Sequence, residues 1–195
     1  MHGLINRSIQ AFVQDTYGQT VWAEIANAAE LGFADFEAML TYEDRLTDAL
    51  LAAASARLSR PREFVLEDLG TYFVSHPRCG PLRRLLRFGG ETFMDFLHSL
   101  DDLQGRGRLA VPDLDLPRLE LFDHTSHRFS LNCQSPHRGA GFVMAGILRA
   151  MADDYGALVM LEHQGTRGDS DRFFIEILDQ SHGEAREFAL AGRDN

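Results

Sequence analysis

The sequence predicts an α+β domain whose first half is helical and whose second half places one helix between two β-hairpins. Before Gly107, apolar side chains recur at spacings of three and four, the period of an amphipathic helix. After Gly107, apolar and polar residues alternate in two separate regions, as in half-buried strands. Between those regions, residues 135–156 read as a helix that is apolar on nearly all sides in its middle.

The helices of the first half follow from this spacing. Ile5, Ile9, Phe12 and Val13 form one stripe of an N-terminal helix that should end near the glycine of "TYGQT". Proline, glycine and polar clusters then separate further apolar-periodic segments from one another. These segments predict helices over residues 19–32, 44–58, 63–76 and 80–90.

The last helix of this half is expected over residues 93–109, "FMDFLHSLDDLQGRGRL", and its apolar stripe contains a glutamine. Gln104 lies four residues after Leu100 and seven after Leu97, so on a continuous helix it points the same way as they do. One interpretation is that Gln104 is a polar position in a buried stripe. The other is that it is exposed where the helix ends at "GRGR".

The second half predicts ββαββ. Residues 117–133 give two antiparallel strands around a polar "DHTSH" break. Ser135 at the N-cap and Pro136 at the first helical position predict the start of the next helix. A second hairpin is expected from residues 157–165 and 171–180, and the polar residues 181–195 are expected to form a frayed tail.

Length and composition favour a single domain over residues 1–180, with a helical subdomain at 1–90 and a long helix plus ββαββ at 91–180. A formal charge of −10 argues against a nucleic-acid partner. No apolar run approaches the length of a membrane span, and "MHGLINRSIQ" lacks the apolar segment of a signal peptide. Two cysteines give no disulfide framework, so a cytoplasmic location is expected.

Three groups of residues are expected to converge on one site. Gln104 supplies a polar floor, and Ile5 and Ile9 supply an apolar wall. The start of the helix after Cys133 should present free backbone N–H groups, which favour an anion. Ser135, His137 and Arg138 add side-chain donors there. The residues thus predict an apolar pocket with one edge that attracts a carboxylate or phosphate.

Several short motifs, in order along the chain, resemble the H-NOX (heme nitric oxide/oxygen-binding) family, the relatives of the sensor domain of soluble guanylate cyclase. They are "MHGLIN", "LGTYFV", "RFGGETFMDFLHSLDDL", "LPRLEL" and the "SPHRG" helix entry. The resemblance implies a helical subdomain above an α/β subdomain, with heme b between them. It therefore agrees with the fold class that the residues predict.

The resemblance also assigns roles to particular residues. Gln104 occupies the position of the family's heme-ligating histidine, one turn after Leu100. Cys133, Ser135 and His137 align with the propionate-binding Tyr-x-Ser-x-Arg motif, in which only the serine is kept, and Arg138 follows one place late. Residues aligned with positions against the heme are Pro117, Ile5, Ile9 and Phe142. Loss of the histidine together with the tyrosine and arginine predicts weak, altered or absent heme binding.

The function expected from the resemblance is a non-catalytic sensory or regulatory domain, with nitric oxide as the gas ligand if heme binds. A bacterial histidine kinase or cyclic-di-GMP enzyme is the implied partner. Two alternatives stay open: a ligand-free pseudo-sensor that keeps only the partner surface, and a binder of another apolar ligand that carries a carboxylate. No serine or cysteine nucleophile with a base was found, so an enzyme is not expected.

Other histidines have simpler interpretations. His124 and His127 form an H-x-x-H on an expected turn, where a metal site would need further ligands. Cys133 and His137 have a spacing that suits a metal or a replacement heme ligand, although they align with the propionate motif. His98 falls on the opposite side of its helix from Gln104 and is expected to be solvated.

Overall fold

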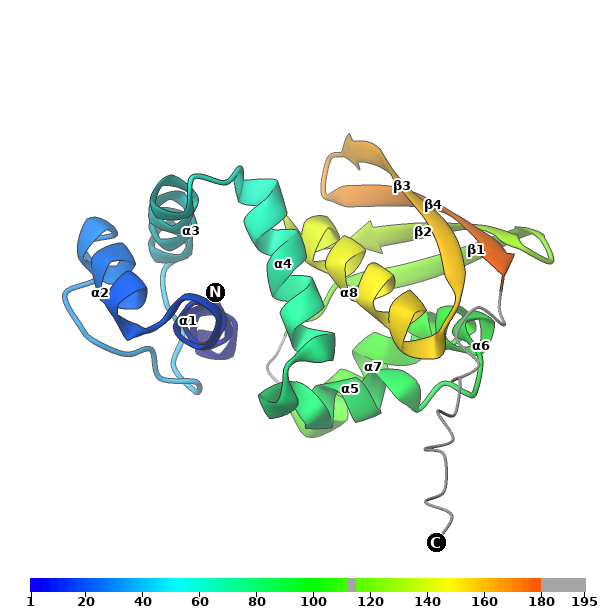
Figure 1. Ribbon diagram of the computed structural model, residues 1–195, viewed down its shortest axis with the longest axis horizontal. Coiled ribbons are helices and arrows are strands. Elements are labelled where there is room, and N and C mark those ends of the chain that lie inside the picture. The colour runs from blue at the N-terminus through cyan, green and yellow to red at the C-terminus, as the bar shows by residue number, and fades with distance from the viewer. Residues whose placement is uncertain (112–114, 180–195) are drawn as a thin grey trace, which may run out of the picture.

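The computed structural model describes residues 1–111 and 115–179 and has the α+β architecture expected from the sequence (Figure 1). Helices form the first half, and a four-stranded sheet with one helix forms the second. The expected polar tail at 181–195 lies outside the described residues. The elements are α1 Gly3–Tyr17, α2 Gln19–Ala28, α3 Asp44–Leu58, α4 Arg62–Ser75, the 3-10 helix η1 Pro77–Cys79, α5 Gly80–Arg87, α6 Phe93–His98, the 3-10 helix η2 Leu100–Asp102, α7 Leu103–Ala110, β1 Arg118–Thr125, β2 Arg128–Gln134, α8 Ala140–Tyr155, β3 Leu158–Arg167 and β4 Ser170–Asp179.

Helix α1 carries two buried polar side chains that tie it to its neighbours. The Asn6 amide oxygen accepts a hydrogen bond of 2.8 Å from the hydroxyl of Thr47 on α3. The Gln10 amide oxygen accepts one of 2.9 Å from the backbone N–H of Phe36, in the loop after α2. Because buried polar groups are costly unless they are paired, these two bonds specify how α1 sits against α3 and the loop.

The sheet is antiparallel throughout, in the order β1-β2-β4-β3. Both predicted hairpins are present, β1–β2 and β3–β4, and the pair β2–β4 joins them. Alternation along β2 and β4 turns one face inward, where Phe129, Leu131, Phe173 and Ile175 are at most 1% exposed. This inner face packs against α8.

Two apolar cores lie on either side of the helix pair α4 and α8. Ile9, Phe12 and Trp22 belong to the core of the helical subdomain, whereas Leu100 and the inner sheet face belong to the other core. Phe73 of α4 and Val143 of α8 pack against both cores. The pair α4–α8 is therefore the wall that the two subdomains share.

Two glycines allow α4 and α8 to approach each other at backbone distance. A Cβ added to Gly70 would lie 2.1 Å from the carbonyl oxygen of Val143, and one added to Gly146 would lie 2.0 Å from that of Glu67. Glu67 also forms an ion pair with Arg149 of α8. A side chain at either glycine would push the two subdomains apart.

Two helix predictions were wrong. The helix expected over 93–109 is broken at Ser99 into α6, η2 and α7, because the Ser99 carbonyl accepts from the Arg106 guanidinium (2.7 Å) as well as from Asp102 N–H (3.3 Å).

The helix expected from Ser135 begins instead at Ala140, after Gly139 in a left-handed conformation (φ +92°). The Ser135 hydroxyl caps only a local turn, where it accepts from His137 N–H at 3.2 Å.

Gly70→Ala should lower the free energy of unfolding by about 1–3 kcal/mol, because the added methyl group meets the backbone of α8 rather than a movable side chain. Urea denaturation measures the change. Gly105→Ala is the matched control. Gly105 is also helical but has nothing within 4 Å of an added Cβ, so this substitution should be neutral or stabilising by up to about 1 kcal/mol. Equal costs for the two substitutions would contradict the close approach of α4 and α8.

Candidate functional site

Gln104 lies in the first turn of α7. Its side chain is half-buried, so it is neither fully buried in the apolar stripe nor fully exposed at the end of the helix. Its side-chain amide donates a hydrogen bond of 2.9 Å to the backbone carbonyl of Leu116. Gly107, one turn later, meets the Leu116 side chain so closely that an added Cβ would lie 2.2 Å from Cδ1. The amide of Gln104 therefore fastens the segment before Pro117 to α7.

Arg106 holds α7 against the helices that precede it. Its guanidinium donates to the backbone carbonyls of Leu85 at the end of α5 (3.2 Å) and Ser99 after α6 (2.7 Å). Both carbonyls lie at or near helix ends, where backbone acceptors are often left without an intrahelical partner, and Arg106 supplies each with a donor. The position of Gln104 thus depends on Arg106 as much as on its own helix.

The apolar candidates divide between the two cores. Ile9 is 2% exposed and Ile5 and Phe142 are half-buried, and all three belong to or pack against the core of the helical subdomain. Leu100 and Cys133 are at most 1% exposed and belong to the other core. Pro117 is half-buried at the start of β1. The structure therefore places these residues on both sides of the junction between the subdomains.

Several donors of the expected anion-binding edge are already bonded within the protein. Ser135 is buried, but its hydroxyl is engaged in the local turn, and its N–H donates to the carbonyl of Asp169 at 2.9 Å. Arg138 is exposed. His137 lies close enough to Asp44, at the start of α3, to contribute to a lowered pKa of that carboxyl, although the N-terminal amine is the larger cause. The backbone N–H groups of Ser135 and His137 are therefore both engaged by acceptors of the protein.

A buried carboxylate that sequence reasoning missed lies beside this edge. Asp171 on β4 is 8% exposed and is the direct strand partner of Cys133 on β2. It accepts from Thr166 (2.5 Å) and pairs with His163 Nε2 (2.9 Å). A Cβ on Gly141, in the first turn of α8, would lie 2.3 Å from the Asp171 carboxyl carbon. The start of α8, which attracts anions, thus faces a carboxylate of the chain itself.

The sequence did carry a signal for Asp171. Strand β4 alternates, and Asp171 occupies the same inward face as Phe173, Ile175 and Ile177. An acidic residue in an inward register needs partners. Those partners, His163 and Thr166, are on the neighbouring strand.

The thiol of Cys133 is held in its neutral form. Complete burial, together with the negative charge of Asp171, raises its pKa to about 12. A thiolate is the form that binds metal or heme iron. Cys133 is therefore poorly suited to replace a lost axial ligand.

The remaining histidine candidates have protein partners. His124 Nε2 lies 2.7 Å from the Ser130 hydroxyl, and His98 pairs with Asp123 at 3.1 Å and packs its ring against Phe129. His98 is thus only partly solvated, with its side chain 48% exposed. Across residues 1–111 and 115–179, no group of three or more His, Cys, Asp or Glu side chains has the arrangement of a metal site.

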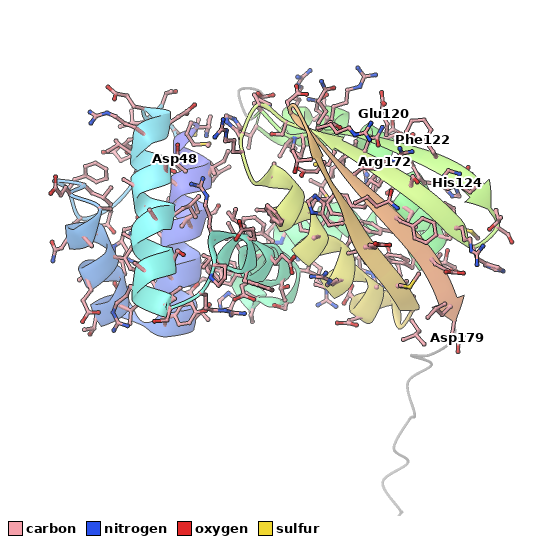
Figure 2. All side chains as sticks on the ribbon, turned by 90° about the horizontal axis from the view of Figure 1, so that it is seen from above. Asp48, Glu120, Phe122, His124, Arg172 and Asp179 are labelled. Atoms are coloured by element: carbon pink, nitrogen blue, oxygen red, sulfur yellow. The ribbon has the colours of Figure 1, made fainter. Side chains whose placement is uncertain are left out.

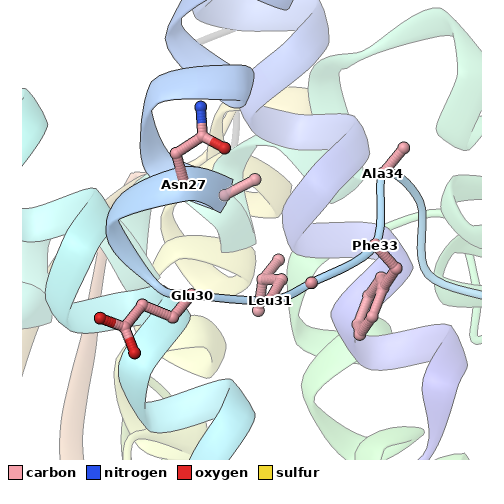
Figure 3. A pocket seen from close by; sticks show the side chains of 7 residues that line it. Asn27, Glu30, Leu31, Phe33 and Ala34 are labelled. Carbon is pink, nitrogen blue, oxygen red and sulfur yellow. The ribbon is translucent and has the colours of Figure 1, made fainter.

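Among the surface hollows of residues 1–111 and 115–179, two lie in the helical subdomain. One, of about 410 Å³, lies at the end of α2 and is lined by residues 26–27 and 30–34, including Glu30 and Phe33 (Figure 3). The other, of about 370 Å³, lies between α1 and α4 and includes Tyr17, Tyr72 and His76. None of the ten candidate residues lines either hollow.

Comparison with known proteins identifies the family. The profile of the haem-NO-binding family (HNOB) matches residues 2–163. The chain belongs to the HNOB family. It is 24% identical over 160 residues to soluble guanylate cyclase 89Db of Drosophila melanogaster, covering 82% of this chain and 24% of that protein. It is also 24% identical over 154 residues to soluble guanylate cyclase gcy-31 of Caenorhabditis elegans, covering 79% and 22%. The chain therefore spans about a quarter of the length of the curated relatives it matches.

Solved H-NOX structures share the fold. The chain superposes on the Fe(II)NO form of an S. oneidensis H-NOX protein with a TM-score of 0.76 at 17% identity, covering 92% of this chain and all of that one. An unliganded Fe(II) H-NOX protein from K. algicida gives 0.74 at 19% identity, covering 91% and 96%. The resemblance found in the sequence motifs is thus confirmed at the level of family and fold.

The HNOB family implies heme, but the residues of this chain do not fit it in the family's manner. Gln104, which the sequence resemblance aligns with the heme-ligating histidine, has its amide N–H bonded to a backbone carbonyl. Cys133, which the resemblance aligns with the propionate-binding tyrosine, carries a neutral thiol, and the buried carboxylate of Asp171 lies beside it. Like charges disfavour each other at short range, so Asp171 opposes the approach of a propionate. Among the described residues, those that the resemblance assigns to heme therefore fit neither the ligation of iron by imidazole nor the binding of propionates by tyrosine and arginine.

Because the pKa of Cys133 is raised in the folded protein, its thiol stays protonated at pH values where the unfolded thiol ionises. The contribution of the buried thiol to the stability of the folded protein is complete below the ordinary thiol pKa near 9. It is lost as the pH rises toward 12, because the thiol then ionises only in the unfolded chain. The difference in unfolding free energy between the wild type and Cys133→Ala should therefore shrink by roughly 1 kcal/mol per unit above about pH 9. Urea denaturation at about pH 8 and about pH 10.5 measures it. Parallel pH profiles would contradict the buried neutral thiol.

Proposed function

We propose that this HNOB chain is a non-catalytic regulatory domain that keeps the sensor fold and its protein contacts but does not hold heme through a protein ligand. The proposal rests on Gln104, which the sequence resemblance aligns with the family's heme-ligating histidine and whose amide N–H donates to the carbonyl of Leu116. A carboxamide is a poor ligand for heme iron beside an imidazole. A switch that depends on breaking a bond between iron and histidine would have no histidine to release.

Asp171 favours this ligand-free function over an apolar ligand that carries a carboxylate. Its carboxylate lies beside Gly141 at the start of α8, where the N–H groups of Ala140 and Phe142 already donate to the carbonyls of His137 and Gly139. The pair with His163 and the bond from Thr166 stabilise Asp171 there. A ligand carboxylate would have to displace or neutralise that arrangement, which costs free energy.

As a regulatory domain, the chain would act through a partner, for which we propose a histidine kinase or a cyclic-di-GMP enzyme in the cytoplasm. None of the helices in the described part of the chain is long and apolar enough to span a bilayer. The matched guanylate cyclases are much longer than the region they share with this chain. A domain that biases the activity of a separate or attached output module is consistent with that relation.

Hemin binding by designed variants tests this function. Gln104→His alone should raise hemin affinity by less than tenfold, because the cradle is still degraded. Adding Cys133→Tyr and His137→Arg should raise it by a further tenfold or more, since charge-assisted bonds to propionates are the strong ones. Soret absorbance during titration with hemin measures both. Gln104→Leu is the control that loses the bond to Leu116 without gaining a ligand.

Equal hemin affinity in the single and triple variants would contradict the argument from the cradle. Tight hemin binding by Gln104→Leu or the wild type would contradict the proposed function itself. Adding Asp171→Asn to the triple variant separates the role of the buried carboxylate. Removal of its charge should raise affinity further, and no change would show that Asp171 does not oppose propionates.

A further inference from the structure

A patch of arginine and apolar side chains covers the outer side of α5 and α7. We define the α5–α7 patch as Arg84, Arg87, Phe88, Arg106 and Leu109. Phe88 is 80% exposed and Leu109 is 88% exposed, the two highest values for large apolar side chains among the described residues. Large exposed apolar side chains that gather on one surface indicate a binding site more often than scattered ones do.

Local sequence explains how the patch forms. In "GPLRRLLRF" the buried Leu86 turns inward, while Arg84 and Phe88 lie one turn apart on the outer side of α5. Arg106 reaches α5 from α7, and its guanidinium lies 6.0 Å from the centre of the Phe88 ring. Leu109 follows Arg106 by one turn on the same side of α7. The hydrogen bond from Arg106 to the Leu85 carbonyl joins α7 to α5, and the two helices lie next to each other in Figure 1.

The patch carries positive charge that its surroundings do not neutralise. Arg87 shares the single carboxylate of Asp154 with Arg83. Arg106 bonds only to neutral oxygens, and within the described residues Arg84 has no ion pair. Glu91 and Asp102, which are near the patch residues in sequence, are exposed and form no ion pair with these arginines. In a chain with a formal charge of −10, this basic surface is a local exception.

We propose that the α5–α7 patch binds an acidic segment of a separate partner protein, which covers Phe88 and Leu109 with an apolar side chain of its own. Arginine beside aromatic side chains is typical of the residues that carry binding energy at interfaces. At physiological salt, charges farther apart than about 8 Å are largely screened from each other. A short acidic segment on the patch therefore interacts mainly with the arginines of the patch. An anionic bilayer or nucleic acid would instead meet the excess negative charge of the whole chain.

This inference adds a partner surface to the proposed regulatory function and does not depend on the state of the heme site. Gln104 and Asp171 are not part of the patch. Its test measures peptide binding rather than hemin binding, so failure of one proposal leaves the other standing.

The probe is a synthetic peptide of glutamates with one tryptophan and two leucines at helical spacing, titrated into the isotope-labelled protein at low salt. Amide shifts should change saturably within residues 83–88 and 105–109. Arg84→Glu and Phe88→Ala should each weaken binding by about tenfold or more. Arg172→Glu is the matched control, because Arg172 is an exposed arginine on the sheet, away from the patch (Figure 2). It should leave the affinity unchanged.

The absence of saturable shifts, shifts centred elsewhere, or equal losses from Arg84→Glu and Arg172→Glu would overturn the proposal. Phosphatidylserine vesicles form a second arm. Vesicle binding that Arg84→Glu abolishes, without peptide binding, would assign the patch to a membrane and contradict a protein partner. The amide spectrum of each variant reports whether it is folded, so a loss of binding is not confused with unfolding.

Discussion

The contact between α4 and α8 is the constraint on which the arrangement of both subdomains depends. Gly70 and Gly146 let the two backbones meet, and Phe73 and Val143 beside them pack against both apolar cores. Packed interiors transmit displacements rather than absorbing them. A shift of α8 along α4 would therefore move Phe142 relative to Leu100 and would change the junction where the family places its ligand.

At that junction, polar groups that would serve a ligand are satisfied by the protein itself. The Gln104 amide bonds to Leu116, the Ser135 hydroxyl to His137 N–H, and Asp171 to Thr166 and His163. The first two bonds engage the N–H donors of Gln104 and His137, and the last two hold the Asp171 carboxylate in place. The proposed function rests on this arrangement, because one fold can host different functions when the residues of its site change.

Sequence reasoning reached the α+β class, both hairpins and the family, because these follow from periodicity and from ordered motifs. It failed where tertiary contacts override local pattern. The break at Ser99 depends on Arg106, seven residues away, and the late start of α8 depends on Gly139 in a left-handed conformation. Asp171 was missed because the pairing of its carboxylate depends on which residues lie beside it on the neighbouring strands, and the sequence alone does not give that register. The hydrogen bond of Gln104 could not be predicted either, because its partner, the carbonyl of Leu116, lies twelve residues away in an irregular segment.

The most direct test is an absorption spectrum of the purified wild-type protein, as isolated and after addition of hemin and reductant without oxygen. We propose that this chain supplies neither a protein ligand for heme iron nor a cradle for the propionates. The purified protein should therefore show no Soret band beyond that of free hemin. A sharp, saturable Soret band at one hemin per chain would contradict the proposal and would show that another residue of this chain ligates the iron.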